Sequence, residues 1–86
     1  MLFQGLDLAR ASLQGAKLVE ADLRDCNLSG ADLRGANLTG AMLEDASVDG
    51  CNLEGARLMG AILTGVAVER ADTSRADMTG ALRSPS

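Results

Sequence analysis

Small and large apolar residues recur along this chain with a period of five residues. Alanine or cysteine opens every five-residue unit from Ala11 to Ala61, and leucine stands two positions later in most units. All ten glycines occupy the fifth position, at residues 5, 15, 30, 35, 40, 50, 55, 60, 65 and 80. A period this short, kept over nearly the whole chain, indicates a repeat architecture.

Neither an α-helix, with 3.6 residues per turn, nor a strand, with a period of 2, matches a spacing of five. A coiled-coil seam is excluded because leucines five apart would precess around the helix. We therefore expect a chain that turns a corner once per unit, with the first and third positions facing inward. The other three positions face outward, and glycine at the fifth supplies the positive φ of a type II turn.

Three features together resemble the A(D/N)LXX signature of the pentapeptide-repeat family: a small first residue, Asp or Asn second and Leu third. The units that carry the resemblance are Ala21-Asp22-Leu23-Arg24-Asp25, Ala31-Asp32-Leu33-Arg34-Gly35 and Ala36-Asn37-Leu38-Thr39-Gly40, with Cys26-Asn27-Leu28 and Cys51-Asn52-Leu53 as cysteine variants. The resemblance covers residues 1 to about 80. It implies an all-β fold, a right-handed quadrilateral parallel β-helix with four pentapeptides in each coil.

That fold gives about four coils of 20 residues, at 1–20, 21–40, 41–60 and 61–80, followed by a C-terminal tail at 81–86. The repeat decays from Val66 onward, and we expect Ser84-Pro85-Ser86 to be a plain terminator. The first coil starts without a cap, so its unpaired backbone edge is expected to favour pairing with another chain. Six fifth positions lack glycine, and we expect their corners to avoid positive φ: Arg10, Glu20, Asp25, Asp45, Arg70 and Arg75.

The composition argues against catalysis. The chain has no His, Tyr or Trp, and its carboxylate pairs, Asp22/Asp25 and Glu44/Asp45, fall at outward positions of a convex rod. General acid–base chemistry needs a partly dry cleft, which a filled coil does not provide. No glycine belongs to a phosphate-binding loop. We therefore expect no enzyme, no catalytic residue, no cofactor and no metal site.

Charge and cysteine usage restrict the partners and the compartment. A net charge of −4, without a basic stripe, argues against direct nucleic-acid binding. Cys26 and Cys51 stand at inward first positions and are expected to be buried free thiols, with a disulfide or metal pair as the alternative. We see neither an apolar run long enough to span a membrane nor a signal peptide, and expect a cytoplasmic location.

Outward charges sort onto four sides if residues twenty apart stack. The first side has a net charge of −3, from Asp22, Asp25, Glu44 and Asp45 against Arg24, and the other three sides have −1, −1 and zero. Some members of the family protect DNA gyrase by resembling DNA. Imitating about 20 Å of duplex requires roughly twelve unopposed negative charges. We therefore expect a non-catalytic structural or protein-binding module whose partner is unknown, and keep a DNA-mimicking gyrase- or topoisomerase-protecting protein as the alternative. An engineered, consensus-like solenoid is a third interpretation.

The first side also has apolar residues at a position that normally faces water. Its second-position column reads Leu2, Asp22, Met42, Ile62 and Leu82, with Val19 and Met59 around the corner. A column of exposed apolar residues is a candidate interface, unless the tail or irregular turns cover it. The candidate interaction surface is therefore Leu2, Val19, Asp22, Asp25, Met42, Glu44, Asp45, Met59, Ile62 and Leu82. We expect a protein partner, or a homodimer formed through this column or through the uncapped first coil.

Overall fold

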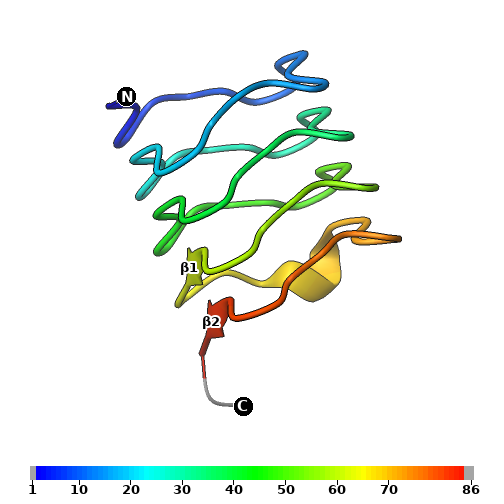
Figure 1. The fold of residues 1–86 in the computed structure, drawn as a ribbon. Coiled ribbons are helices and arrows are strands. Elements are labelled where there is room, and N and C mark those ends of the chain that lie inside the picture. The colour runs from blue at the N-terminus through cyan, green and yellow to red at the C-terminus, as the bar shows by residue number, and fades with distance from the viewer. Residues whose placement is uncertain (1, 85–86) are drawn as a thin grey trace.

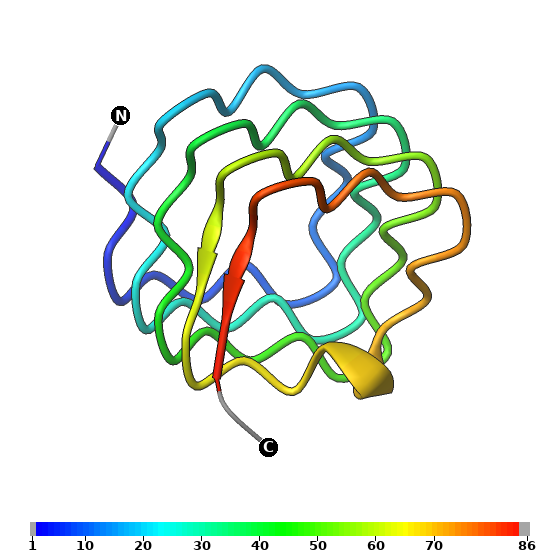
Figure 2. The same cartoon turned by 60° about the horizontal axis from the view of Figure 1, so that its bottom comes forward.

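Parallel backbone pairing joins residues that are twenty apart in sequence. In the computed structural model, which describes residues 2–84, Leu2 pairs with Asp22, Asp22 with Met42, and Met42 with Ile62. Two strands are long enough to be named, β1 (Ile62–Leu63) and β2 (Leu82–Arg83), and they pair in the same register. The chain winds as a right-handed quadrilateral parallel β-helix whose coils stack in register (Figures 1 and 2).

Each corner is a hydrogen-bonded turn between one unit and the next. At a regular corner the first residue donates its N–H to the third residue of the unit before, as Ala31 does to Leu28 at 3.0 Å. The fifth residue stands inside this turn with positive φ, near +67° at glycines such as Gly30 and Gly35. Glycine is therefore frequent at this position because it takes that conformation without steric cost.

The expectation that corners without glycine avoid positive φ was wrong at five of the six. Positive φ occurs at Arg10 (63°), Glu20 (58°), Asp25 (61°), Asp45 (62°) and Arg75 (59°). Stacking explains the result. In the first three coils the N–H of each fifth residue donates to a carbonyl oxygen of the next coil, for example Asp25 to Glu44 at 3.0 Å. In the last coil the carbonyl just before Arg75 accepts the equivalent bond from Gly55. The shared turn geometry preserves these bonds. The hydrogen bonds between coils therefore impose positive φ on non-glycine residues, for which this conformation is unfavourable.

Arg70 is the exception, and it ends the only helical turn described, the 3-10 helix η1 (Val68–Arg70) within residues 2–84. Ala67, before η1, does not pair with Ser47 as the register of twenty would require. The corner bond also shifts by one residue, since Gly50 donates to Arg70. This unit has Val66 at its small first position, no Asp or Asn second and no glycine fifth.

Asp and Asn recur at the second position for a local reason. Their side-chain oxygen accepts a hydrogen bond from the backbone N–H two residues later, as Asn27 does from Ser29 at 3.0 Å. Asp72 and Asp77 make the same contact with Ser74 and Thr79. Such local bonds favour the turn that follows.

The core is a stack of leucines over alanines and cysteines. Leu23, Leu28, Leu33 and Leu38 of the second coil are at most 1% exposed. The corresponding residues of the first coil are less covered, because Phe3, Leu8 and Leu13 are only partly buried. The N-terminal end of the core is therefore less shielded than its middle.

Both cysteines are free and buried, as expected. The Cys26 Sγ donates to the carbonyl oxygen of Phe3 at 2.8 Å. Burial raises the pKa of the Cys26 thiol, and it raises that of Cys51 to about 11. Both side chains therefore behave as small apolar core residues that resist deprotonation.

The segment expected as a tail, 81–86, begins with residues that continue the solenoid. Leu82 pairs with Ile62 in β2, and the Ser84 hydroxyl accepts a hydrogen bond from the N–H of Gly65 at 2.6 Å. Pro85 and Ser86 lie outside the described residues, as does the terminator expected there. Leu82 thus extends the apolar column and does not fold across it.

Candidate interaction surface

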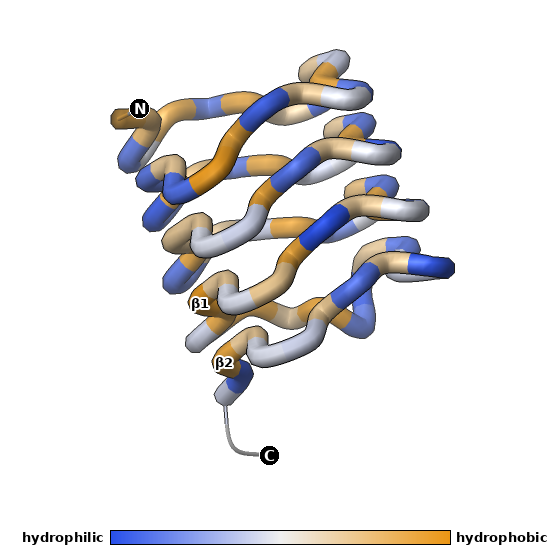
Figure 3. The backbone as a smooth tube through the Cα atoms, in the orientation of Figure 1, coloured by the Kyte–Doolittle hydropathy of each residue, from blue (hydrophilic) through white to orange (hydrophobic). Residues whose placement is uncertain are grey.

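The β-helix places the second-position residues of the first side in one vertical column. Consecutive pairings connect Leu2, Asp22, Met42, Ile62 and Leu82. In Figure 3 hydrophobic colour marks β1 and the start of β2, the lower part of this column. The stacking expected from the sequence is therefore present, and it brings four apolar side chains together around one carboxylate.

Exposure varies along this column and around its corner. Leu2 is 85% exposed, Leu82 61% and Val19 47%. Met42, Ile62 and, around the corner, Met59 are half-buried. The column therefore presents most of its apolar surface at its two ends and a partly covered strip between them.

Asp22 does not reach the surface, because it is only 3% exposed. Its carboxylate accepts two hydrogen bonds from the Arg24 guanidinium, at 2.9 and 2.8 Å, and one from the Arg24 backbone N–H at 3.2 Å. These bonds hold the pKa of Asp22 at about 2. The pair is neutral overall, so the net charge of −3 on this side comes from Asp25, Glu44 and Asp45.

The remaining acids of the surface lie at its corners. Asp25 and Asp45 are exposed, and Glu44 is half-buried with Oε1 inaccessible and without a hydrogen-bond partner in residues 2–84. The Asp45 side chain packs against Gly65, where even a Cβ would overlap its carboxylate. The surface therefore combines an apolar strip with three carboxylates along one edge.

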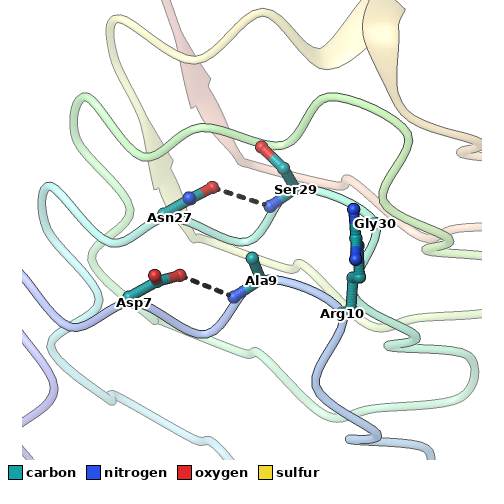
Figure 4. Close-up of a pocket in the computed structure, with 6 residues that line it drawn as sticks. All are labelled: Asp7, Ala9, Arg10, Asn27, Ser29 and Gly30. Carbon is teal, nitrogen blue, oxygen red and sulfur yellow. Dashed lines mark hydrogen bonds between the residues drawn. The ribbon is translucent and has the colours of Figure 1, made fainter.

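A shallow hollow of about 620 Å³ lies between the first two coils on the next side. Figure 4 shows Asp7 and Asn27 one above the other, each bonded to the backbone two residues on, with Arg10 beside Gly30. Ser29 also lines the hollow, and the hydrogen bond it makes to Asn27 comes from its backbone N–H and not from its hydroxyl. The six lining residues therefore offer no nucleophile–base pair.

Leu6 is an exposed apolar residue that the sequence analysis missed. It occupies an inward first position, where Ala or Cys usually stands, and it is 47% exposed. A leucine in place of the small residue was the available signal. It was not recognised because first positions were expected to be buried in every coil.

The described residues, 2–84, contain neither a membrane-spanning helix nor a metal-binding cluster. No helix in this part of the chain is long and apolar enough to cross a membrane. No group of three or more His, Cys, Asp or Glu side chains there could hold a metal ion.

Known proteins share both the repeat and the fold. A family model for pentapeptide repeats matches residues 7–45 and 36–72, with eight copies. A pentapeptide repeat protein (Rfr23) from the cyanobacterium Cyanothece 51142 is 44% identical, with a TM-score of 0.70, over 90% of this chain and 49% of that one. No curated protein matches the sequence.

Two further solved structures agree. A pentapeptide repeat protein from the Arabidopsis thaliana thylakoid lumen is 32% identical, with a TM-score of 0.87, over 91% of this chain and 54% of that one. A pentapeptide repeat protein from Nostoc PCC 7120 is 35% identical, with a TM-score of 0.54, over 84% and 64%. The present chain thus spans between 49% and 64% of these three proteins.

Proposed function

Because this chain belongs to the pentapeptide-repeat family, we propose that it is a non-catalytic module that binds a protein through its first side. The observation that carries the proposal is the column of Met42, Ile62 and Leu82, which are apolar at a position where most other units have Asp, Asn or another polar residue. A regular repeat does not need apolar side chains there, since Asp and Asn stabilise the turn better. Their presence on one side favours an interaction role.

The chemistry of the surface indicates the kind of partner. Carboxylates at Asp25, Glu44 and Asp45 border the apolar strip along one edge. An apolar centre with a charged rim is the usual composition of a protein–protein interface. We expect the partner to present an apolar side chain flanked by Lys or Arg.

The experiment compares two pairs of substitutions that add the same charge at equivalent positions. Met42→Asp with Ile62→Asp changes the first side, whereas Asn37→Asp with Asn52→Asp changes second positions on other sides. Proteins captured from the source cell by the parent chain should be lost with the first pair and retained with the second. Equal capture by both variants would contradict the proposal, and circular dichroism would verify that each is folded.

The DNA-mimic alternative gains no support from the arrangement of charge. Asp22 and Asp32 are both held by arginines, Arg24 and Arg34, in paired hydrogen bonds. Few unopposed acids remain beside the roughly twelve that 20 Å of duplex would require. A gyrase supercoiling assay in the presence of a fluoroquinolone would reveal such an activity. The cytoplasmic location stays a prediction, since one relative comes from a thylakoid lumen.

A further inference from the structure

The middle of the first side presents side chains but no free backbone groups to a partner. Met42 donates its N–H to Ala21 at 2.9 Å and accepts from Leu23 at 2.7 Å. Ile62 uses both of its backbone groups in the same way with the coil before. These bonds run along the rod, so an extended peptide lying on this side finds no backbone partner in the column. A segment that binds here must satisfy its own backbone, as a helix does.

The apolar strip at the middle of this side is narrow. Met42 and Ile62 are half-buried, and each lies between two coils, because Met42 pairs with Asp22 and Ile62, and Ile62 with Met42 and Leu82. Half-buried Met59 adds a third side chain at the corner that precedes Ile62. Two packed sheets bury broad faces against each other, whereas a helix buries a stripe. The width of the strip therefore favours a helix.

The spacing of the coils matches the rise of a helix. Neighbouring strands of a sheet are about 4.8 Å apart, so Met42, Ile62 and Leu82 span about 10 Å along the rod. Residues i, i+4 and i+7 of an α-helix lie on one face and span about 10.5 Å, at about 1.5 Å per residue. A helix parallel to the rod can therefore place three successive apolar side chains against the three residues of the column.

The two flanks of the strip differ in charge. The corner that follows the column has Asp25, Glu44 and Asp45, and none of them forms an ion pair among residues 2–84. In the corner that precedes the column, Glu20 is the only charged residue. No atom lies within 4 Å of a Cβ built on Gly60, so this corner leaves room beside the strip. A helix on the strip meets carboxylates along one flank and an open, nearly uncharged corner along the other.

A second copy of this chain does not complement those carboxylates. In the second and third coils, Arg24 is the only basic residue of the first side, and its guanidinium is bound to Asp22 at 2.9 and 2.8 Å. Two first sides placed face to face would therefore bring three carboxylates from each copy into the contact without a free cation to oppose them. The cations must come from a different protein.

We propose that the first side binds an amphipathic α-helix of a partner protein, which lies along the apolar strip with Lys or Arg on the flank that faces Asp25, Glu44 and Asp45. Apolar residues at i, i+4 and i+7 are the usual anchors of such a helix. This inference rests on the proposed function, because it takes the first side as the interface. It adds the secondary structure of the partner segment and the flank on which its charge lies.

Selection from a random peptide library tests the proposal without knowledge of the natural partner. Displayed peptides of about 14 residues, roughly four helical turns, are selected on the parent chain after removal of those that bind the Met42→Asp, Ile62→Asp variant. The selected sequences should have apolar residues at i, i+4 and i+7, with Lys or Arg on one flank. Selected sequences without this pattern, or no selected sequence at all, would overturn the proposal.

Substitutions in the strip measure its part in the contact. Met42→Asp with Ile62→Asp should weaken the binding of a synthetic selected peptide at least about tenfold, because apolar side chains would then meet carboxylates. Asn37→Asp with Asn52→Asp adds the same charge on other sides and should leave the affinity unchanged. Similar losses with both pairs would contradict a contact at the strip.

A second pair of variants examines the charged flank. Asp25→Asn with Asp45→Asn should weaken binding by about three- to tenfold and reduce its dependence on salt. Asparagine tolerates the positive φ of these two corners. Asp7→Asn with Asp49→Asn removes the same charge from another side, where both carboxylates are exposed, and should have little effect. Equal effects of the two pairs would show that the flank has no specific role.

Circular dichroism of the bound peptide tests for a helix. The free peptide should be largely unfolded, since isolated helices this short are marginal in water, and it should gain helical signal on binding. The chain itself adds little to that signal, because η1 is the only helical turn within residues 2–84. Binding to the first side without gain of helix would refute this inference and leave the proposed function standing. Peptides and captured proteins that are insensitive to Met42→Asp with Ile62→Asp would refute both.

Discussion

At the scale of the residue, Asp22 shows how one side chain changes the character of a surface. Its carboxylate lies between Leu2 and Met42 in the column, and its hydrogen bonds to Arg24 replace the water that it loses. The sequence counted it as part of an acidic face, whereas the structure makes it the neutral anchor of an apolar one. Asp32 and Arg34 repeat the arrangement on another side in a more open setting.

These two carboxylates predict that the free energy of unfolding decreases at acidic pH. The pKa of Asp22 and of Asp32 is about 2 in the folded chain against an ordinary 3.8, because arginine hydrogen bonds favour the charged form. A depressed pKa stabilises the fold above pH 3.8, and this contribution is lost as the pH falls toward about 2. Urea unfolding midpoints should therefore fall through this window.

The matched variants are Asp22→Asn and Asp22→Asn with Asp32→Asn. Each should be less stable than the parent at neutral pH, and its midpoint should depend less on pH between about 2 and 4. If the Asp22→Asn chain kept the parent's decrease in stability at acidic pH unchanged, the role assigned to the Asp22–Arg24 pair would be wrong.

At the scale of the element, the turn at each corner keeps nearly the same geometry throughout the solenoid. This geometry is adopted even by residues that normally prefer negative φ. Fifteen of the sixteen fifth positions from residue 5 to 80 have positive φ, ten of them glycines and five not. Non-glycine residues in this region are strained by about 1–2 kcal/mol. The exception, Arg70, shows that the corner yields only where its unit has also lost the small first residue and the second-position Asp or Asn.

Two arginines of the last coil test this account. Arg75, with φ of 59°, and Arg70, in η1, occupy the same position of neighbouring units. Arg75→Gly should stabilise the fold by about 0.5–1 kcal/mol, since relief of strain exceeds the backbone entropy cost. Arg70→Gly should destabilise it by up to about 1 kcal/mol. Thermal or urea unfolding measures both, and equal gains would show that φ is not the cause.

The repeat made the coil, the inward leucines and the stacked column predictable, because each follows from a residue type recurring at a fixed spacing. Three features were not predictable from single units. The positive φ at Glu20 and its equivalents depends on hydrogen bonds with a neighbouring coil. The burial of Asp22 depends on Arg24 reaching back to it, and the exposure of Leu6 depends on its position at an end.

At the scale of the whole molecule, stability is distributed by coil. Leu33 is 1% exposed, between one coil and the next, whereas Leu13, its neighbour in the same inward column, is only partly buried. In a solenoid each coil is stabilised mainly by its neighbours. The ends should therefore open at lower free energy than the middle.

The same substitution at these two positions measures the gradient. Leu33→Ala should cost about 2–5 kcal/mol, because it leaves a cavity that is enclosed on both sides. Leu13→Ala should cost about half as much or less, measured by urea unfolding. Similar losses at both positions would contradict this gradient and indicate that the first coil is as well covered as the second.

The pairing of residues twenty apart has a consequence for how such a gene can change length. Duplication or deletion of twenty codons lengthens or shortens the rod while every side keeps its own residues in line. A change of five codons preserves the corner and the buried leucine, yet it turns everything beyond that point by a quarter of a revolution relative to the rest. Natural length variants that retain one continuous interaction surface should therefore differ by whole coils. In variants that differ by a single pentapeptide, the residues of that surface should lie on two different sides of the rod.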